Sequence, residues 1–172
     1  MYIRKNKDED REMLERLYSL VFPDEDLLPL LHGLLDEKDK VLSLVAVSND
    51  IRVKGHAMFT LCEVSGSSDR IVLLGPVAVY PDIQKQGVGT ALIQDGMRFM
   101  ADDGVSGVCV LGDSLYYGRF GFDACYHIMP PYEIPQEWSS AWQFISLNDI
   151  EMHSRGKLCV PDPWRNPALW SS

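Results

Sequence analysis

One stretch, from Arg70 to Leu92, restricts the fold of this chain more than any other; it reads RIVLLGPVAVYPDIQKQGVGTAL. Its first part is almost continuously apolar, which is typical of a strand buried on both faces. Gly75 and Pro76 interrupt that strand, and because proline cannot donate a hydrogen bond to a neighbouring strand, they predict a bulge. After a short turn, the glycines of QKQGVG stand where the pattern changes to that of a helix. The stretch therefore predicts an interrupted strand that leads through a glycine-rich turn into a helix.

The sequence on both sides predicts a mixed α/β fold. From about Gln86 to Asp103 apolar residues recur at helical spacing, and the short apolar run GVCVL follows at 107–111. A strand, a helix and a second strand in that order form a crossover with parallel strands. The helical face over 86–103 is expected to consist of Val88, Ala91, Leu92, Phe99 and Met100. The elements expected upstream are a strand at 1–6, helices at 8–22 and 24–39, and hairpin strands at 41–48 and 52–64. We expect a mixed, mostly antiparallel central sheet with flanking helices, in which the parallel pair, 70–80 and 107–111, splays apart.

Length and composition restrict the classes of protein to which the chain can belong. Its 172 residues suit one compact domain over 1–172, with the motifs in about 1–147 and a tail at 148–172 for which we infer no function. No apolar run approaches the roughly 20 residues of a membrane span. The first residues, MYIRKNKDEDRE, lack the apolar stretch of a secretory leader, so we expect a cytoplasmic protein. The four cysteines follow no metal-ligand spacing and are expected to be free thiols.

The charge of the chain bears on its partners. A net charge of −9 argues against a nucleic-acid partner, because a phosphate backbone requires a basic surface. An acidic surface favours small cationic partners such as amines, but it also serves solubility alone. Both interpretations stay open at this point.

The glycine-rich turn has the properties of a phosphate-binding site. The first N–H groups of a helix lack partners within the helix and lie at the positive end of its dipole. Gly87 and Gly89 at such a start leave the backbone amides open to a phosphate and tolerate the dihedral angles of a tight turn. Two other phosphate loops are excluded. A P-loop requires Lys and Ser or Thr after its last glycine, where Thr90 and Ala91 stand, and the dinucleotide fingerprint requires glycine in place of Leu92.

The interrupted strand supplies the second half of the expected binding site. A bulge at Gly75–Pro76 would bend the strand away from its parallel neighbour and leave backbone groups of Val77, Ala78 and Val79 without a sheet partner. An extended ligand with amides of its own can pair with such an edge as an added strand. The ligand thus predicted carries a diphosphate at one end and an amide-bearing arm at the other. Coenzyme A (CoA) has both.

These features resemble the Gcn5-related N-acetyltransferase (GNAT) family. Its acetyl-CoA motif is Q/R-x-x-G-x-G/A at a helix start, and Gln84, Gly87 and Gly89 match it. The family's order of elements is similar to the one predicted here over about 1–147, and VAVYP resembles its fourth strand. The resemblance implies that the strand and the loop hold acetyl-CoA. The cofactor-binding residues that it implies are Val77, Ala78, Val79, Gln84, Lys85, Gln86, Gly87, Val88, Gly89 and Thr90.

A later block, LGDSLYYGRFGFDAC, carries a candidate catalytic residue and resembles the YhbS-like subgroup of this family. Asp113 or Ser114 is expected to cap a short helix that ends near Gly121. Family members often carry Tyr-x-x-x-Gly-Phe here, and the match begins at Tyr117. The resemblance implies that Tyr117 lies by the acetyl-CoA sulfur and protonates the departing thiolate; the alternative is that it only packs on the sheet. An asparagine often found early in this helix in the family is replaced by Val110.

The resemblance implies an enzyme that moves the acetyl group of acetyl-CoA to a primary amine by direct attack in a ternary complex, without a metal. Its acceptor would be a small amine or a peptide amine, with no nucleic acid or membrane as partner, and a homodimer stays open. The alternative is a non-catalytic acyl-CoA-binding module that senses or regulates. Glu63 and Asp113 are candidates for the general base, and Lys85 is either a phosphate contact or a solvated side chain.

Overall fold

The computed structural model describes residues 1–148 and 154–171. The strands are β1 (Tyr2–Lys5), β2 (Val41–Val47), β3 (Val53–Val64), β4 (Arg70–Val79), β5 (Gly107–Leu111), β6 (Asp123–Ala124), β7 (Ile128–Met129), β8 (Trp142–Ser146) and β9 (Gly156–Cys159). The α-helices are α1 (Arg11–Val21), α2 (Leu28–Asp36), α3 (Val88–Asp102) and α4 (Ser114–Tyr117). Short 3₁₀ helices lie at Asp8–Asp10, Pro81–Ile83, Gly118–Phe120, Gln136–Ala141, Asp162–Trp164 and Pro167–Trp170.

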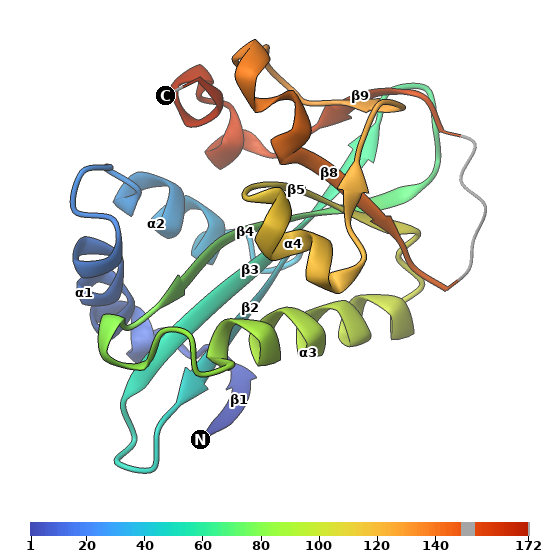
Figure 1. The fold of residues 1–172 in the computed structure, drawn as a ribbon. Coiled ribbons are helices and arrows are strands. Elements are labelled where there is room, and N and C mark those ends of the chain that lie inside the picture. The colour runs from blue at the N-terminus through green and yellow to red at the C-terminus, as the bar shows by residue number, and fades with distance from the viewer. Residues whose placement is uncertain (149–153, 172) are drawn as a thin grey trace. The chain divides into compact units, whose positions relative to one another are not determined.

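The described residues form two compact units. The first consists of Met1–Thr60 and Gly75–Phe99, and the second of Leu61–Leu74 and the described part of Met100–Ser172. β3, β4 and α3 contribute residues to both (Figure 1). A single domain over 1–172 stays a prediction.

The strands of the first unit pair in the order β1-β2-β3-β4. β1 pairs antiparallel with β2, and β2 forms an antiparallel hairpin with β3. The register of the hairpin places Val45 opposite His56 and Ala46 opposite Gly55, and a bulge follows between Ala46 and Val47. The strand predicted at 1–6 and the hairpin predicted from 41–64 are both present.

The two faces of this sheet carry different helices. Neighbouring residues along a strand point to opposite faces. His56 faces α1, because its Nδ1 lies 2.8 Å from the hydroxyl of Tyr18. Gly55 faces α3, since a Cβ there would lie 3.0 Å from side-chain atoms of Leu92 and Val88. In this unit, α1 and the start of α3 therefore cover opposite faces of the sheet (Figure 1).

A polar network is buried on the α1 side of this sheet. His56 Nδ1 is hydrogen-bonded to the hydroxyl of Tyr18, and His56 Nε2 lies 2.6 Å from Ser43 Oγ. Burial lowers the pKa of His56 to about 3, so the imidazole is neutral at neutral pH. One hydroxyl therefore donates to the ring and the other accepts from it. The network gives both ring nitrogens of the buried His56 a hydrogen-bond partner, which indicates a structural role for this histidine.

α3 packs closely against the sheet because it carries a glycine at the contact. A Cβ on Gly96 would lie 2.0 Å from ring atoms of Phe59, so only glycine admits that ring. Three residues of the predicted apolar face are buried: Val88, Leu92 and Met100. The prediction that Phe99 lies on this face was wrong, because Phe99 is 42% exposed and the ammonium group of Lys5 lies 4.5 Å from its ring centre. Such a cation–π contact suits an aromatic ring that stays partly in solvent.

The strands of the second unit pair in the order β3-β4-β5-β8-β6, and β9 pairs with β3 and β7. β4 and β5 run parallel from Ile71↔Gly107 to Leu74↔Val110. β8 is antiparallel to β5 and β6, and β9 is antiparallel to β3 and parallel to β7. The parallel pair predicted from the crossover is thus confirmed, and so is the mixed, mostly antiparallel sheet with flanking helices.

The tail, rich in proline and tryptophan, folds into the second unit. Trp170 is 1% exposed, and its ring centre lies 5.9 Å from that of Trp142 and 5.7 Å from that of Trp164. Its indole N–H donates to the carbonyl of Trp164 at 3.1 Å. Together with the pairing of β9 on β3, these contacts make the described tail part of the core of this unit.

Two further findings concern the whole described chain. Among residues 1–148 and 154–171, no helix has both the length and the apolar character to cross a bilayer. All four cysteines are free thiols; Cys62, Cys109 and Cys125 are buried, and Cys159 is exposed. The prediction that the cysteines are free thiols is thus confirmed.

Candidate active site

The parallel pairing of β4 with β5 stops midway along β4. β4 continues to Val79, but its register with β5 ends at Leu74↔Val110. The next residues are Gly75, with a φ of 136°, and Pro76, and a cis peptide bond joins them. A φ of this value favours glycine, because a side chain would be strained there. The pairing with β5 thus ends directly before Gly75 and Pro76, but β4 itself is continuous from Arg70 to Val79, so the bulge stays a prediction.

Beyond Pro76, the backbone groups of β4 alternate between two edges. The N–H of Tyr80 donates to the carbonyl of Lys54 at 2.7 Å and so points to β3. Because N–H groups alternate along a strand, those of Val77 and Val79 point to the edge away from β3. The carbonyl of Val79 accepts a hydrogen bond from Gln84 Nε2 at 3.0 Å. This edge is where an extended ligand with amides of its own can pair.

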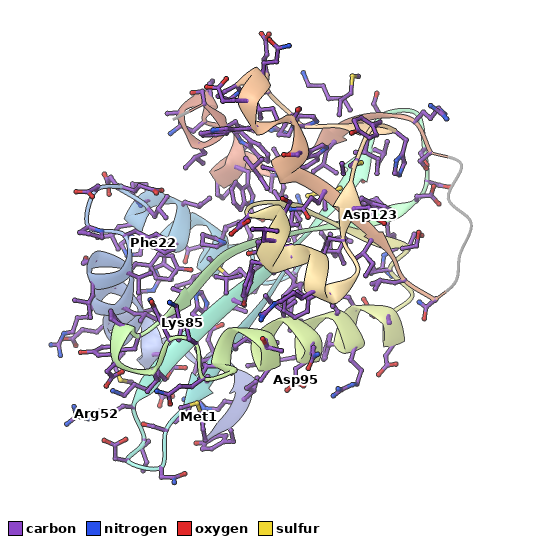
Figure 2. All side chains as sticks on the ribbon, viewed as in Figure 1. Met1, Phe22, Arg52, Lys85, Asp95 and Asp123 are labelled. Atoms are coloured by element: carbon purple, nitrogen blue, oxygen red, sulfur yellow. The ribbon has the colours of Figure 1, made fainter. Side chains whose placement is uncertain are left out.

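The loop between β4 and α3 is exposed from Gln84 to Gly87, and Figure 2 labels Lys85 on it. Lys85 and Gly87 have φ values of 63° and 86°, both in the left-handed region. A Cβ on Gly87 would meet no atom within 4 Å. Glycine is therefore favoured here by the backbone dihedral angle and not by a lack of space for a side chain. Gln86 Nε2 lies 3.5 Å from the carbonyl of Asp82, so this contact too joins residues close in sequence.

α3 begins directly after this loop. The N–H of Ala91 donates to the carbonyl of Gly87 at 3.0 Å, which closes the first turn. The N–H groups of Val88 and Gly89 therefore lie at the amino end of a helix of 15 residues, where the dipole is positive. Val88 is buried, whereas Gly89 and Thr90 are half-buried. The motif Gln84–Gly89 thus stands at a helix start, as predicted.

Tyr117 is the last residue of α4. Asp113 caps this helix, because its Oδ1 accepts the N–H of Leu115 at 2.9 Å, and its carbonyl accepts the N–H of Tyr117 at 2.9 Å. Of the two predicted caps, Asp113 is therefore the one used. Gly121, with a φ of 99°, follows the 3₁₀ turn after α4. The placement of Val110 early in this helix was wrong, since Val110 is buried in β5.

The ring of Tyr117 is half-buried among aromatic side chains. Its centre lies 4.9 Å from that of Tyr116 and 5.8 Å from that of Phe122, both in edge-on geometry, and 6.4 Å from that of Phe120. Burial raises the pKa of Tyr117, so its phenol is protonated at neutral pH. Within residues 1–148 and 154–171 the hydroxyl makes no hydrogen bond, while every fully buried side-chain oxygen has one. The hydroxyl oxygen is therefore not fully buried.

One contact of Tyr117 was missed at the level of the sequence. A Cβ on Gly112 would lie 2.4 Å from Cε2 of Tyr117, so the tyrosine ring occupies the space beside this glycine. Gly112 stands inside the block LGDSLYYGRFGF, just before the capped helix. The spacing of that block predicts the helix but does not say onto which residue the ring folds back.

The other candidates have ordinary surroundings. Glu63 is exposed on β3 and pairs with Cys159 across the ladder to β9, and Asp113 serves as the cap of α4. Arg98, near in sequence to the loop, lies 3.3 Å from the carboxylate of Asp95 on the same helix. In the part of the chain that the structure describes, no three His, Cys, Asp or Glu side chains gather as a metal site.

The sequence is similar to those of bacterial proteins described as uncharacterized N-acetyltransferases. The family model described as "Acetyltransferase (GNAT) family" matches residues 9–122, which is more than half of the chain. The uncharacterized N-acetyltransferase YjhQ of Escherichia coli (strain K12) is 34% identical over 147 residues, and the match covers 81% of each chain. YhbS of the same strain, also described as an uncharacterized N-acetyltransferase, is 29% identical over 127 residues, which cover 74% of this chain and 76% of YhbS.

Solved structures agree with these matches. The crystal structure of YhbS from Escherichia coli in complex with CoA has a TM-score of 0.85 and 26% identity, and the match covers 96% of this chain and 92% of that one. A GNAT family acetyltransferase from Brucella melitensis in complex with acetyl-CoA has a TM-score of 0.76 and 27% identity, over 94% of this chain and 96% of the other. With its parallel strand pair, its glycine-rich helix start and these relatives, the chain belongs to the acetyltransferase (GNAT) family.

Proposed function

We propose that this chain is an N-acetyltransferase that moves the acetyl group of acetyl-CoA to a primary amine by direct attack in a ternary complex. The observation that carries the proposal is that β4 continues beyond its last parallel pair and then leads through a glycine-rich loop into α3. This run offers extended backbone amides at one end and the amides of a helix start at the other. The relatives add support, since the solved YhbS structure contains CoA and the Brucella structure contains acetyl-CoA.

Each part of this run suits a different part of acetyl-CoA. The outward N–H groups of Val77 and Val79 can pair with the amides of the pantetheine arm as an added strand would. The diphosphate would meet the loop and the start of α3, because the positive end of a helix dipole favours anions. Lys85 adds an exposed positive charge on a chain whose net charge is −9. The proposed contacts are Val77, Ala78, Val79, Gln84, Lys85, Gln86, Gly87, Val88, Gly89 and Thr90.

Tyr117 is the general acid in this proposal. The neutral amine nitrogen bonds to the thioester carbonyl carbon, the carbon–sulfur bond breaks, and the leaving thiolate takes the phenol proton. The attacking nitrogen loses a proton to a base or to water, and the phenolate regains one from solvent, so charge and protons balance. Because burial raises the pKa of Tyr117, the phenol is present as a donor across the neutral range. A backbone N–H of Val77 or Val79 would stabilise the negative charge that develops on the carbonyl oxygen.

The acceptor must lose a proton before it attacks. An alkyl amine has a pKa near that of lysine, about 10.4, so at neutral pH a base or a water chain has to deprotonate it. Glu63 and bound water are the proposed routes, and the proposed acceptors are small amines and peptide amines. The proposed compartment is the cytoplasm, where four free thiols would stay reduced.

Two measurements test the function. Calorimetry with acetyl-CoA and with CoA should show that both bind the folded chain. A thiol-release assay across amines, peptides and polyamines should then identify an acceptor that yields free CoA. Binding without any thiol release would favour the non-catalytic acyl-CoA-binding module instead. If neither acetyl-CoA nor CoA binds, both functions are excluded.

A further inference from the structure

We infer that Gly112 is the positioning residue of Tyr117: it leaves the space in which the tyrosine ring lies, and so sets where the phenol hydroxyl stands. The inference rests on the proposed function, in which that hydroxyl is the acid. It assigns to Gly112 an effect on turnover that acts only through Tyr117.

The contact between the two residues is tight. A Cβ on Gly112 would lie 2.4 Å from Cε2, 2.9 Å from Cδ2 and 3.4 Å from Cζ of Tyr117. Carbon atoms in ordinary contact are about 3.5–4.0 Å apart, so a methyl group at 112 would require a shift of more than about 1 Å. The three atoms form one edge of the ring, and that edge occupies the place of a side chain at 112.

The backbone of Gly112 is held on both sides and is not the part that would move. Its N–H donates to the carbonyl of Ala141 at 2.9 Å, and its carbonyl accepts from Gln143 Nε2 at 3.1 Å. Gln143 is 1% exposed, and its Nε2 also lies 3.4 Å from the carbonyl of Ala141, so the backbone of Gly112 is tied to a buried side chain. The ring of Tyr117 can instead rotate about its own side-chain torsions.

The ring can be displaced in few directions. Phe122, which is buried, lies edge-on against Tyr117 and prevents a shift toward the core of this unit. A methyl group at 112 therefore moves the ring toward solvent and carries the hydroxyl with it. A displacement of about 1 Å at a reacting group can lower a rate by about 100-fold. Gly112→Ala should accordingly lower kcat by about 10- to 100-fold, while the Kd for acetyl-CoA stays near that of the wild type.

The chain offers a matched control at Gly118, the residue after Tyr117. Its φ is −57°, and a Cβ there would meet no atom within 4 Å. Gly118→Ala therefore adds the same methyl group to the same segment without strain or contact. It should keep kcat within about twofold of the wild type, as exposed substitutions generally do.

A double-mutant cycle separates positioning from general packing. In a Tyr117→Phe background the hydroxyl is gone, so Gly112→Ala should change the remaining kcat by less than about twofold. If Gly112→Ala instead lowers kcat by the same factor with and without that hydroxyl, the inference is overturned. If Tyr117→Phe alone leaves turnover unchanged, the acid role fails, which is a different and recognisable result.

A spectroscopic measurement tests the same inference without any acceptor. In protein labelled with isotopic tyrosine, the ring signal of Tyr117 is the one that disappears from the NMR spectrum of Tyr117→Phe. Gly112→Ala should shift that signal and bring its titration closer to that of an exposed tyrosine, whereas Gly118→Ala should leave both unchanged. A Tyr117 signal that Gly112→Ala does not move, in a variant with the wild-type circular dichroism, overturns the inference whatever the activity.

Discussion

The loop before α3 and the aromatic cluster around Tyr117 both depend on glycine, but for opposite reasons. At Gly87 the space beside the Cα is empty, and the backbone angle of 86° requires the glycine. At Gly112 it is the space that is occupied, because the tyrosine ring fills it. In the loop, glycine permits a left-handed backbone angle. In the aromatic cluster, glycine leaves room for the ring of Tyr117. Alanine at each position tests a different part of the proposed reaction.

The two regions also differ in how they are held. The loop is exposed and is tied by short-range contacts, such as that of Gln84 with the carbonyl of Val79. The aromatic cluster around Tyr117 is held by contacts between residues distant in sequence, such as the hydrogen bond of Gly112 to Ala141. We therefore expect substitutions in the loop to alter the Kd for acetyl-CoA, and substitutions in the aromatic cluster around Tyr117 to alter kcat.

The largest effect is expected from Tyr117→Phe, which removes only the hydroxyl. A general acid contributes about 10²- to 10⁴-fold, so kcat should fall by that range while the Kd for acetyl-CoA stays unchanged. Steady-state kinetics and calorimetry on the same preparation check both statements. Tyr116→Phe is the control, because it makes the same change on the neighbouring ring and should keep kcat. A Kd that weakens as much as kcat falls would contradict the separation of the two regions.

Acid should lower stability through the buried network of His56 and leave the surroundings of Tyr117 unaffected. His56, in the buried network with Tyr18 and Ser43, has a folded-state pKa lowered to about 3, against about 6.5 in the unfolded chain. The unfolded state therefore binds more protons between these values, and the free energy of unfolding falls as pH falls below about 6.5. Between pH 7 and pH 5 the loss from His56 should be about 2 kcal/mol. The phenol of Tyr117 stays protonated over this whole range, so the aromatic cluster around it should not respond.

Urea unfolding at several pH values measures this loss, and His56→Gln supplies the control. Glutamine can hydrogen-bond but does not titrate, so the variant should lose most of the dependence between pH 7 and pH 5 even if it is less stable overall. His127, whose pKa is also lowered, contributes in the same direction and accounts for a smaller remainder. An unchanged slope in His56→Gln would place the titration outside the buried network.

The third effect concerns the shape of the loop. Gly87→Ala places a side chain at a φ of 86°, which costs about 1–2 kcal/mol per residue. If the loop opens to relieve this strain, the Kd for acetyl-CoA should weaken about 5- to 30-fold at an unchanged saturating kcat. Gly66→Ala is a matched control, because Gly66 has a φ of 78° and equally empty surroundings in the turn between β3 and β4. It should cost stability without weakening the Kd, and equal losses of affinity in both variants would contradict the role of the loop.

The loop could be predicted from the sequence because its causes are local. Pro76 lacks an N–H, glycine admits left-handed angles, and the helical spacing begins at Val88; each of these properties belongs to the residues themselves. The cap at Asp113 was predicted for the same reason. What the sequence could not supply were contacts chosen by packing: the ring of Tyr117 against Gly112, Phe99 beneath the ammonium of Lys5, and the burial of Trp170. Such contacts depend on side-chain torsions and on partners distant in sequence.

The smallest effect is expected from removing the charge of Lys85. Lys85 is exposed and has a φ of 63°, so Lys85→Asn removes the charge while asparagine tolerates the same backbone angle. If Lys85 meets the diphosphate, the Kd for acetyl-CoA should weaken about 2- to 5-fold at low salt, and the difference from wild type should shrink as salt screens the charge. Lys40→Asn, at an exposed lysine just before β2, removes one charge elsewhere and controls for net charge. Equal effects of the two variants would mean that Lys85 is a solvated side chain, and that the loop binds its ligand through backbone amides alone.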